Sequence, residues 1–181
     1  QFQAHLQLDA ARLQEWSEAV PQAQLEAALA LLRKARKVWV VGYRHSHLTA
    51  FYAQSLLAQV RPEVLTLNDA AGREADLLAC ASDKDVVLAV DFRRRSTRLP
   101  QVLAAARTVG AQTVVLTDAP VSALAMQAQV VLRCGASSQQ GLFDSYVCGV
   151  SLVNFLAATL AQQLRNATQE RLARIERLHV A

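Results

Sequence analysis

Five short runs of mainly hydrophobic residues recur along the chain. They cover residues 37–42, 64–67, 85–90, 112–117 and 129–133. The runs are rich in valine and leucine and show no alternation with polar residues, which is typical of strands buried on both faces of a parallel sheet. The first run ends in Gly42, as expected of a strand that closes into a tight turn. The pattern therefore predicts five strands.

Helical patterns separate most of these runs. They cover residues 46–60, 69–81 and 97–109, with a shorter one at 121–128, and two more close the chain at 143–164 and 168–178. Strands that alternate with helices form right-handed βαβ units, which place helices on both faces of one parallel sheet. The sequence therefore predicts an α/β fold, a doubly wound five-stranded parallel sheet with the flavodoxin-like strand order.

The N-terminal part is predicted to form two helices. Apolar residues recur at helical spacing over residues 6–36, and Pro21 interrupts them because proline removes a helical hydrogen-bond donor. We interpret residues 1–36 as lead-in or connector helices and residues 37–181 as the main domain. Trp39 and Phe51 are expected in the core. The chain starts at Gln1 rather than methionine, so we expect it to be a piece of a longer protein.

Composition narrows the class of protein. Of 181 residues, 52% are hydrophobic and 19% charged, which excludes a disordered chain and fits a single domain. The net charge is +4, and nearly all of the positive charge is arginine, which suits planar recognition of carboxylate or phosphate. Cys80, Cys134 and Cys148 are predicted to be buried free thiols. We find no secretory signal and no apolar run long enough to cross a bilayer, so we expect a cytoplasmic protein without membrane contact.

Two basic loops are the strongest candidate for a binding site. In an open doubly wound sheet, ligands bind beyond the carboxyl ends of the strands, where the strand order reverses. Residues 42–47 and 91–98 follow the first and third strands there, and five arginines in them are expected to converge on one crevice: Arg44, Arg93, Arg94, Arg95 and Arg98. Each loop also leads into a helix N-terminus, which favours an anion. The alternative is a solvated surface turn. The predicted ligand-binding residues of the loops are Gly42, Tyr43, Arg44, His45, Ser46, His47, Asp91, Phe92, Arg93, Arg95 and Ser96.

Four segments resemble a known family. They are VWVVGYRHSHLTA at 38–50, DVVLAVDFRRRS at 85–96, AARTVGAQTVVLTD at 105–118 and SALAMQAQVVL at 122–132. From Val38 to about Leu160 the chain resembles the SIS (sugar isomerase) domain of RpiR/MurR-type transcription regulators. The resemblance implies a domain that binds a small anionic metabolite, a sugar phosphate or related acid, and couples it to DNA through an N-terminal helix-turn-helix domain that lies outside this chain. It also implies a homodimer or tetramer.

The family's phosphosugar motifs are altered. Of the usual G-x-G-S-S loop, only Gly42 and Ser46 match. In the loop that usually reads S-x-S-G-x-T-x-E, Asp91, Arg93 and Arg94 replace the two serines and the glycine, Ser96 replaces the threonine, and Arg98 falls where the acid would be. The position of the site therefore carries over, whereas the ligand need not be a sugar phosphate. The resemblance adds Asp144 and Ser145 to the ligand-binding residues, with a helix N-cap as the alternative.

Three other hypotheses remain open. A metal could bind His45 and His47 with Asp91, but the spacing is common by chance, and we predict no metal or cofactor. A sugar-phosphate aldose–ketose isomerase would need a base, and its candidates are His45, His47, Asp91, Asp144 and Glu74, the last expected to point outwards. Since no carboxylate stands at the acid position of the motif, we assign no catalytic residue. The third alternative is an assembly domain with a vestigial pocket. Separately, we interpret residues 137–140 as a candidate lid or a solvated loop.

Overall fold

The sheet has the predicted strands and the predicted order. A computed structural model describes residues 1–119, 123–135 and 145–180. All five strands are parallel and follow the order β2-β1-β3-β4-β5, which is the flavodoxin-like arrangement. Their bounds are β1 Val38–Gly42, β2 Val64–Thr66, β3 Val86–Asp91, β4 Gln112–Thr117 and β5 Val130–Arg133.

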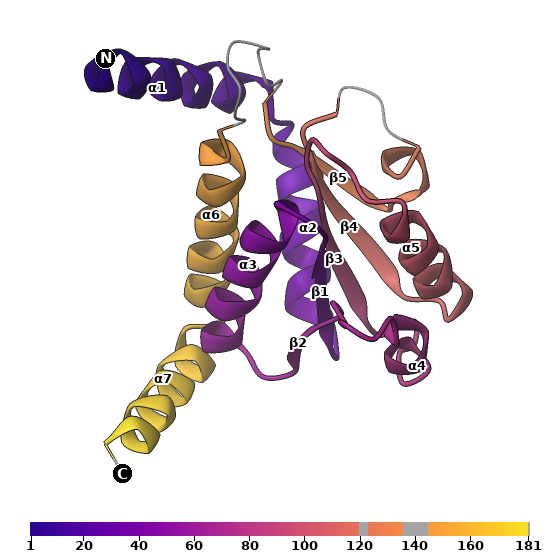
Figure 1. Ribbon diagram of the computed structural model, residues 1–181. Coiled ribbons are helices and arrows are strands. Elements are labelled where there is room, and N and C mark those ends of the chain that lie inside the picture. Colours follow the sequence, from indigo (N-terminus) through magenta and orange to yellow (C-terminus); the bar gives the residue numbers. More distant parts are fainter. Residues whose placement is uncertain (120–122, 136–144, 181) are drawn as a thin grey trace.

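Helices cover both faces of the sheet (Figure 1), so the doubly wound α/β fold is confirmed. One face carries α2 (Gln22–Lys34), α3 (Ser46–Val60) and α6 (Val147–Gln163), and the other carries α4 (Glu74–Leu78) and α5 (Arg98–Thr108). Strand residues alternate between two cores: Val38 and Val40 face the first group of helices, and Trp39 and Val41 face the second. This burial on both sides explains why each strand is a continuous apolar run.

The two terminal helices project from the body of the molecule. Helix α1 (Phe2–Ala19) contains no buried residue, and α7 (Arg165–His179) buries Thr168 alone among its residues. Helix α2 behaves differently, because it buries Ala28, Leu29 and Leu32 in the core. By packing, α2 therefore belongs with the sheet, whereas α1 is attached at its C-terminal part. The domain boundary at residue 36 stays a prediction.

The helix predicted at residues 69–81 is much shorter, and that prediction was wrong at its N-terminal end. Helix α4 spans Glu74–Leu78. Before it, the carboxylate of Asp69 accepts a hydrogen bond from the backbone N–H of Ala71, and Gly72 has a φ of 78°. An aspartate that bonds its own chain two residues later forms a turn in competition with a helix. The pattern at 121–128 becomes a 3-10 turn, η1 (Ala125–Gln127), and its first two residues lie outside the described parts.

Two burial predictions were also wrong. The side chain of Phe51 is 61% exposed, because it lies on the outward stripe of α3 with Leu48. Cys80 is exposed just after the shortened α4, whereas Cys134 and Cys148 are buried free thiols as expected. Trp39 lies in the core as predicted.

Among the described residues, no single helix is long and apolar enough to cross a bilayer. The α6–α7 pair would suffice by length and composition, but it is bent by 106°.

Candidate functional site

A cleft opens at the carboxyl ends of β1 and β2, with Arg98 of the segment after β3 at its edge. Its volume is about 410 Å³. It is lined by the end of β1 and the loop after it, the first turn of α3, the loop after β2 and the first residue of α5: Gly42, Tyr43, Arg44, His47, Asn68, Asp69, Ala70 and Arg98. Ligands of doubly wound sheets bind at this position.

The loops around the cleft are fixed to one another by hydrogen bonds. The backbone N–H of Gly42 donates to Oδ1 of Asn68 (3.1 Å), and Nδ2 of Asn68 donates to the Gly42 carbonyl (2.7 Å). The buried hydroxyl of Ser46 accepts the backbone N–H of Phe92 (3.0 Å), which joins the loop after β1 to the loop after β3. The cleft is therefore held on a rigid frame at its base.

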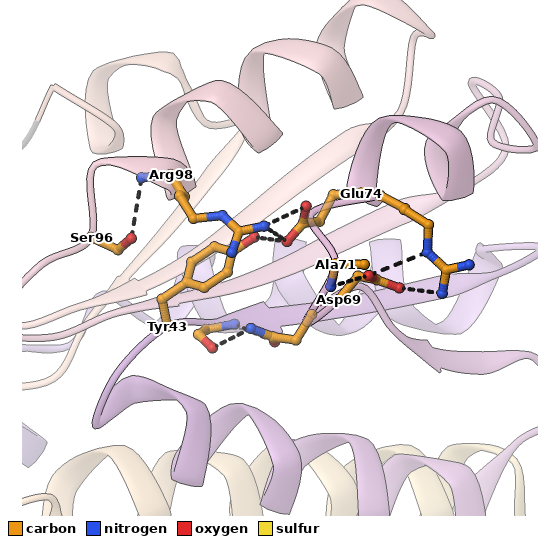
Figure 2. Close-up of polar contacts among 9 residues, drawn as sticks. Tyr43, Asp69, Ala71, Glu74, Ser96 and Arg98 are labelled. Carbon is orange, nitrogen blue, oxygen red and sulfur yellow. Dashed lines mark hydrogen bonds and ion pairs between the residues drawn. The ribbon is translucent and has the colours of Figure 1, made fainter.

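Three polar side chains form a connected group on one wall of the cleft (Figure 2). The hydroxyl of Tyr43 donates to Oε1 of Glu74 at 2.6 Å. Nη2 of Arg98 donates to both carboxylate oxygens of Glu74, at 2.7 and 2.8 Å, and the guanidinium carbon lies 5.1 Å from the centre of the Tyr43 ring. Glu74 is buried, so the expectation that it points outwards was wrong. It holds Arg98 at the edge of the cleft.

The electrostatics of this group favour an ionised Glu74. Burial raises the pKa of Glu74, but hydrogen bonds from Tyr43 and Arg98 outweigh it and bring that pKa below the ordinary value. Burial and the same carboxylate raise the pKa of the Tyr43 phenol. Nε and Nη1 of Arg98 form no hydrogen bond with described residues, so this guanidinium keeps donors for a ligand.

We expect Glu74→Gln to lower the free energy of unfolding at pH 7 by about 1.5 kcal/mol, since a charge-assisted bond to Arg98 becomes a neutral one. The folded-state pKa of Glu74 lies below its ordinary value of 4.5, so its ionised form stabilises the fold. That contribution is complete above pH 4.5 and disappears as the pH falls through the lower folded-state pKa. In urea unfolding, the difference between wild type and variant should therefore shrink below pH 4.5. Glu170→Gln, on exposed α7, is the control, and a pH-independent difference would contradict the assignment.

Arg44 supplies a second guanidinium to the cleft, and no ion pair joins it to a described residue. Its φ is 57°, a left-handed conformation that costs a non-glycine residue about 1 kcal/mol or more. Arg94 in the other basic loop has a φ of 66°. Both arginines stand where the family motifs have glycine, so the loops keep a glycine-like backbone while presenting guanidinium groups. His47 lines the cleft beside Arg44.

We call residues 91–98 the arginine loop, and its middle part is held by carboxylates of the chain itself. Nε of Arg95 donates to Asp91 at 3.1 Å, and its Nη2 donates to Asp118. The backbone N–H of Arg93 donates to the same Asp118 carboxylate at 2.9 Å. Of the five arginines expected in one crevice, Arg44 and Arg98 line the cleft. The expected convergence of all five was therefore wrong, because Asp91 and Asp118 bind this part of the loop.

The other predicted site residues have structural contacts. Phe92 is buried and packs on Tyr146 with ring centres 5.4 Å apart, and the Ser96 hydroxyl accepts the backbone N–H of Arg98. His45 is exposed at the N-cap of α3 and is not among the residues that line the cleft. The hydroxyl of Ser145 accepts the N–H of Val147 at the start of α6.

Some predictions about the site lie beyond what the structure describes. Asp144 and residues 137–140 fall outside the described residues. Within the described ranges, no group of three or more His, Cys, Asp or Glu residues is arranged to hold a metal ion.

The sequence reasoning missed three polar residues at or near the cleft, Asn68, Asp69 and Asp118, and it expected Glu74 to point outwards. A usable signal was present for the three that were missed. Asn68 and Asp69 follow the run at 64–67, and Asp118 follows the run at 112–117, so each stands at the carboxyl end of a predicted strand. Glu74 had no such signal, because its inward direction depends on the turn that shortens α4.

Comparisons with known proteins agree on the fold. The SIS domain family model matches residues 31–159. The sugar isomerase domain of an RpiR transcription factor from Sphaerobacter thermophilus is similar, with a TM-score of 0.86, 25% identity and coverage of 95% of this chain and 96% of that one. Vibrio vulnificus NanR complexed with ManNAc-6P has a TM-score of 0.81 at 17% identity, with 98% of this chain and 68% of that one covered.

The chain is also similar in sequence to a curated protein. It is the uncharacterised HTH-type transcriptional regulator YbbH of Bacillus subtilis, 27% identical over 127 residues, which are 70% of this chain. The chain spans 44% of the length of that relative.

Proposed function

Because the chain belongs to the SIS domain family, we propose that it is the effector-sensing domain of an RpiR-type transcription regulator. The effector is a small anionic metabolite that binds in the cleft at the carboxyl ends of the strands. Binding is coupled to DNA through a helix-turn-helix domain on the same polypeptide. A regulator of this kind works in the cytoplasm, where it meets both the metabolite and the DNA.

The observation that carries this proposal is the pairing of Arg44 and Arg98 across one cleft. Arg44 is exposed and joined to no described acid, and Arg98 is held by Glu74 with two nitrogens left for a ligand. Two guanidiniums with donors in a fixed plane favour bidentate binding of phosphate or carboxylate. His47 adds a third group that can donate a hydrogen bond.

The remaining lining residues favour a ligand that carries hydroxyl groups as well as an anion. Asp69 and Asn68 contribute oxygen and amide groups on the side of the cleft formed by the loop after β2. Carboxylate oxygens accept hydrogen bonds from sugar hydroxyls. The similarity to NanR, whose structure was solved with ManNAc-6P, supports a sugar phosphate as the first class to test.

The carboxylates at and near the cleft argue against an isomerase that uses one of them as its base. A general base that moves a proton next to a carbonyl works best with a pKa near the operating pH. Hydrogen bonds hold the pKa of Glu74 below its ordinary value, and the bond from Arg73 does the same for Asp69. Burial raises the pKa of Asp91, but this carboxylate is bound to Arg95 and is not among the residues that line the cleft. We therefore propose binding without turnover.

A thermal-shift screen tests the proposal. The panel contains sugar phosphates, phosphorylated amino sugars, carboxylic acids and sulfonates, each with its neutral counterpart. A ligand at 100 times its Kd stabilises the folded state by about 2.7 kcal/mol, which raises the Tm by several degrees. We expect shifts with anionic sugars and none with neutral ones, and NMR of the incubated sugar should show no product. Turnover of a hexose phosphate would support the isomerase instead, and the absence of any shift at millimolar anion would leave assembly as the role.

Assembly through α3 and α6 completes the proposal. These two helices are neighbours, joined by a hydrogen bond from Tyr52 to Asn154 (2.7 Å), and neither contains Lys, Arg, Asp or Glu. Their exposed side chains include Leu48, Phe51 and Phe155. An uncharged apolar surface is typical of the centre of an interface, and in a two-fold dimer it meets its own copy without like-charge repulsion.

We expect Phe51→Glu combined with Phe155→Glu to give a monomer, because the dimer would then bury four unpaired carboxylates. Sedimentation velocity measures the change. Gln101→Glu, at an exposed position of α5 on the other side of the sheet, is the control and should leave the dimer intact. A wild-type monomer at micromolar concentration would contradict the proposed interface.

A further inference from the structure

A series of hydrogen bonds connects the arginine loop to helix α1. It begins at Asp118, whose carboxylate accepts the N–H of Arg93 and the guanidinium of Arg95. Asp118 follows β4, and the carbonyl of the next residue, Ala119, accepts Nε of Arg133 at 3.3 Å. The carbonyl of Arg133 in turn accepts the indole N–H of Trp16 on α1 at 2.5 Å.

The start of this series is sensitive to an anion. The Asp118 carboxylate binds a backbone N–H and a guanidinium of the arginine loop, and these are the types of donor that an anionic ligand uses. Its side chain is 13% exposed, so bonds lost there are not fully replaced by water. The same loop ends in Arg98 at the cleft. A ligand that binds and displaces Arg98 therefore also displaces the part of the loop that is hydrogen-bonded to Asp118.

The end of the series is weakly held. Helix α1 contains no buried residue, and Trp16 is partly buried against the core. Besides the Trp16 bond, the thiol of Cys148 donates to the Arg12 carbonyl at 3.9 Å, a weak contact. Since α1 contains no buried residue, it is expected to open locally at low free energy, so a change at Arg133 has a large effect on its position.

We propose that Asp118 and Arg133 couple the arginine loop to α1, so that an anion bound in the cleft at Arg98, where the loop ends, changes how α1 is held. The inference takes its ligand, a small anion, from the proposed function. The residues that connect the loop to α1 follow from the hydrogen bonds alone. Asp118 acts as a positioning residue that alternates between holding the loop and releasing it. The hydrogen bonds and the chain between Asp118 and Ala119 join the loop to α1, so a displacement at one end can reach the other.

Hydrogen–deuterium exchange of the whole chain without ligand tests the path directly. Asp118→Asn weakens the hold on Arg95 and should speed amide exchange in α1 about fivefold, with β3 and β4 unchanged. Arg133→Met should speed it similarly, since it removes the bond to Ala119. Asp83→Asn and Arg107→Met change exposed residues elsewhere and are the matched controls. Unchanged exchange in α1, or a uniform rise over the whole chain, would overturn the coupling.

A second arm uses inorganic phosphate with wild type and Arg133→Met. In wild type, phosphate should protect residues 91–98 and alter exchange in α1, whereas in Arg133→Met it should protect the loop alone. Protection of the loop without any change in wild-type α1 would overturn the coupling and leave the binding function intact. If phosphate protects neither the arginine loop nor residues 42–47 at the cleft, the proposed binding site fails, and the ligand-free variants still decide the coupling. Protection of residues 42–47 alone would keep the binding site and overturn the coupling.

Discussion

Replacing both Arg44 and Arg98 with alanine is expected to weaken binding of an anionic sugar by about 1,000-fold. Each guanidinium supplies charge-assisted hydrogen bonds worth about 2 kcal/mol to the ligand, and both line the same cleft. The two losses add to about 4 kcal/mol, which corresponds to roughly 1,000-fold in Kd. Titration calorimetry with a hit from the thermal-shift screen measures the change.

The controls for this variant distinguish three causes of weaker binding: loss of positive charge in general, loss of the binding site and loss of folding. Arg107→Ala with Arg177→Ala removes the same charge from exposed positions on α5 and α7 and should leave Kd within about threefold, since exposed charges act weakly at physiological salt. Arg98→Ala leaves the Glu74 carboxylate without its guanidinium, so Arg44→Ala alone is the cleaner test. The affinity of Arg44→Ala for the ligand should still fall about 30-fold, and its Tm should stay that of wild type. Equal binding by Arg44→Ala and wild type would exclude this cleft as the anion site.

Gly42→Ala is expected to have the largest effect on stability. A Cβ at this position would lie 2.7 Å from the backbone carbonyl oxygen of Ser46 and 2.9 Å from Cβ of Ala50. Neither can rotate away, because both belong to the first turns of α3. Overpacking of this kind costs about 3 kcal/mol, and it would displace the loop that carries Arg44.

Gly72→Ala is the matched control for Gly42→Ala. Gly72 has a φ of 78°, and an added Cβ would meet Nη2 of Arg98 at 3.3 Å, a contact that a shift of a few tenths of an ångström relieves, so its cost of about 1 kcal/mol comes mainly from backbone strain. Urea unfolding of both variants gives the comparison. If Gly42→Ala unfolds at the same urea concentration as wild type, the tight contact between β1 and α3 is not present in solution.

The sheet could be predicted from the sequence because each strand is buried on both faces. Such strands appear as uninterrupted valine and leucine runs, and the order follows from the rules of parallel crossovers. Helix α4 could not be predicted as well, since the turn at Asp69 and Gly72 competes with an apolar pattern of helical period. Phe51 was misplaced for a different reason: periodicity identifies a helix, but the exposed side of α3, with Leu48 and Phe51, is as apolar as its core side.

The position of the cleft could be predicted, but the pairing of the charged side chains around it could not. Both loops and Arg44 followed from the ends of β1 and β3. Which acid neutralises which arginine depends on distances between loops far apart in sequence. Glu74 pairs with Arg98 across 24 positions and Asp118 with Arg95 across 23. The free arginines of the cleft were therefore overcounted from the sequence.

A pair of calorimetric titrations tests the central claim most directly. The wild-type chain is titrated with a sugar 6-phosphate found in the screen and, separately, with the same sugar without its phosphate. Binding of the phosphorylated form at least about 100-fold tighter than the neutral form is the predicted result, because the guanidiniums of Arg44 and Arg98 recognise the anion. Equal affinity for the two forms would contradict the account, since the cleft would then recognise the sugar without using its arginines.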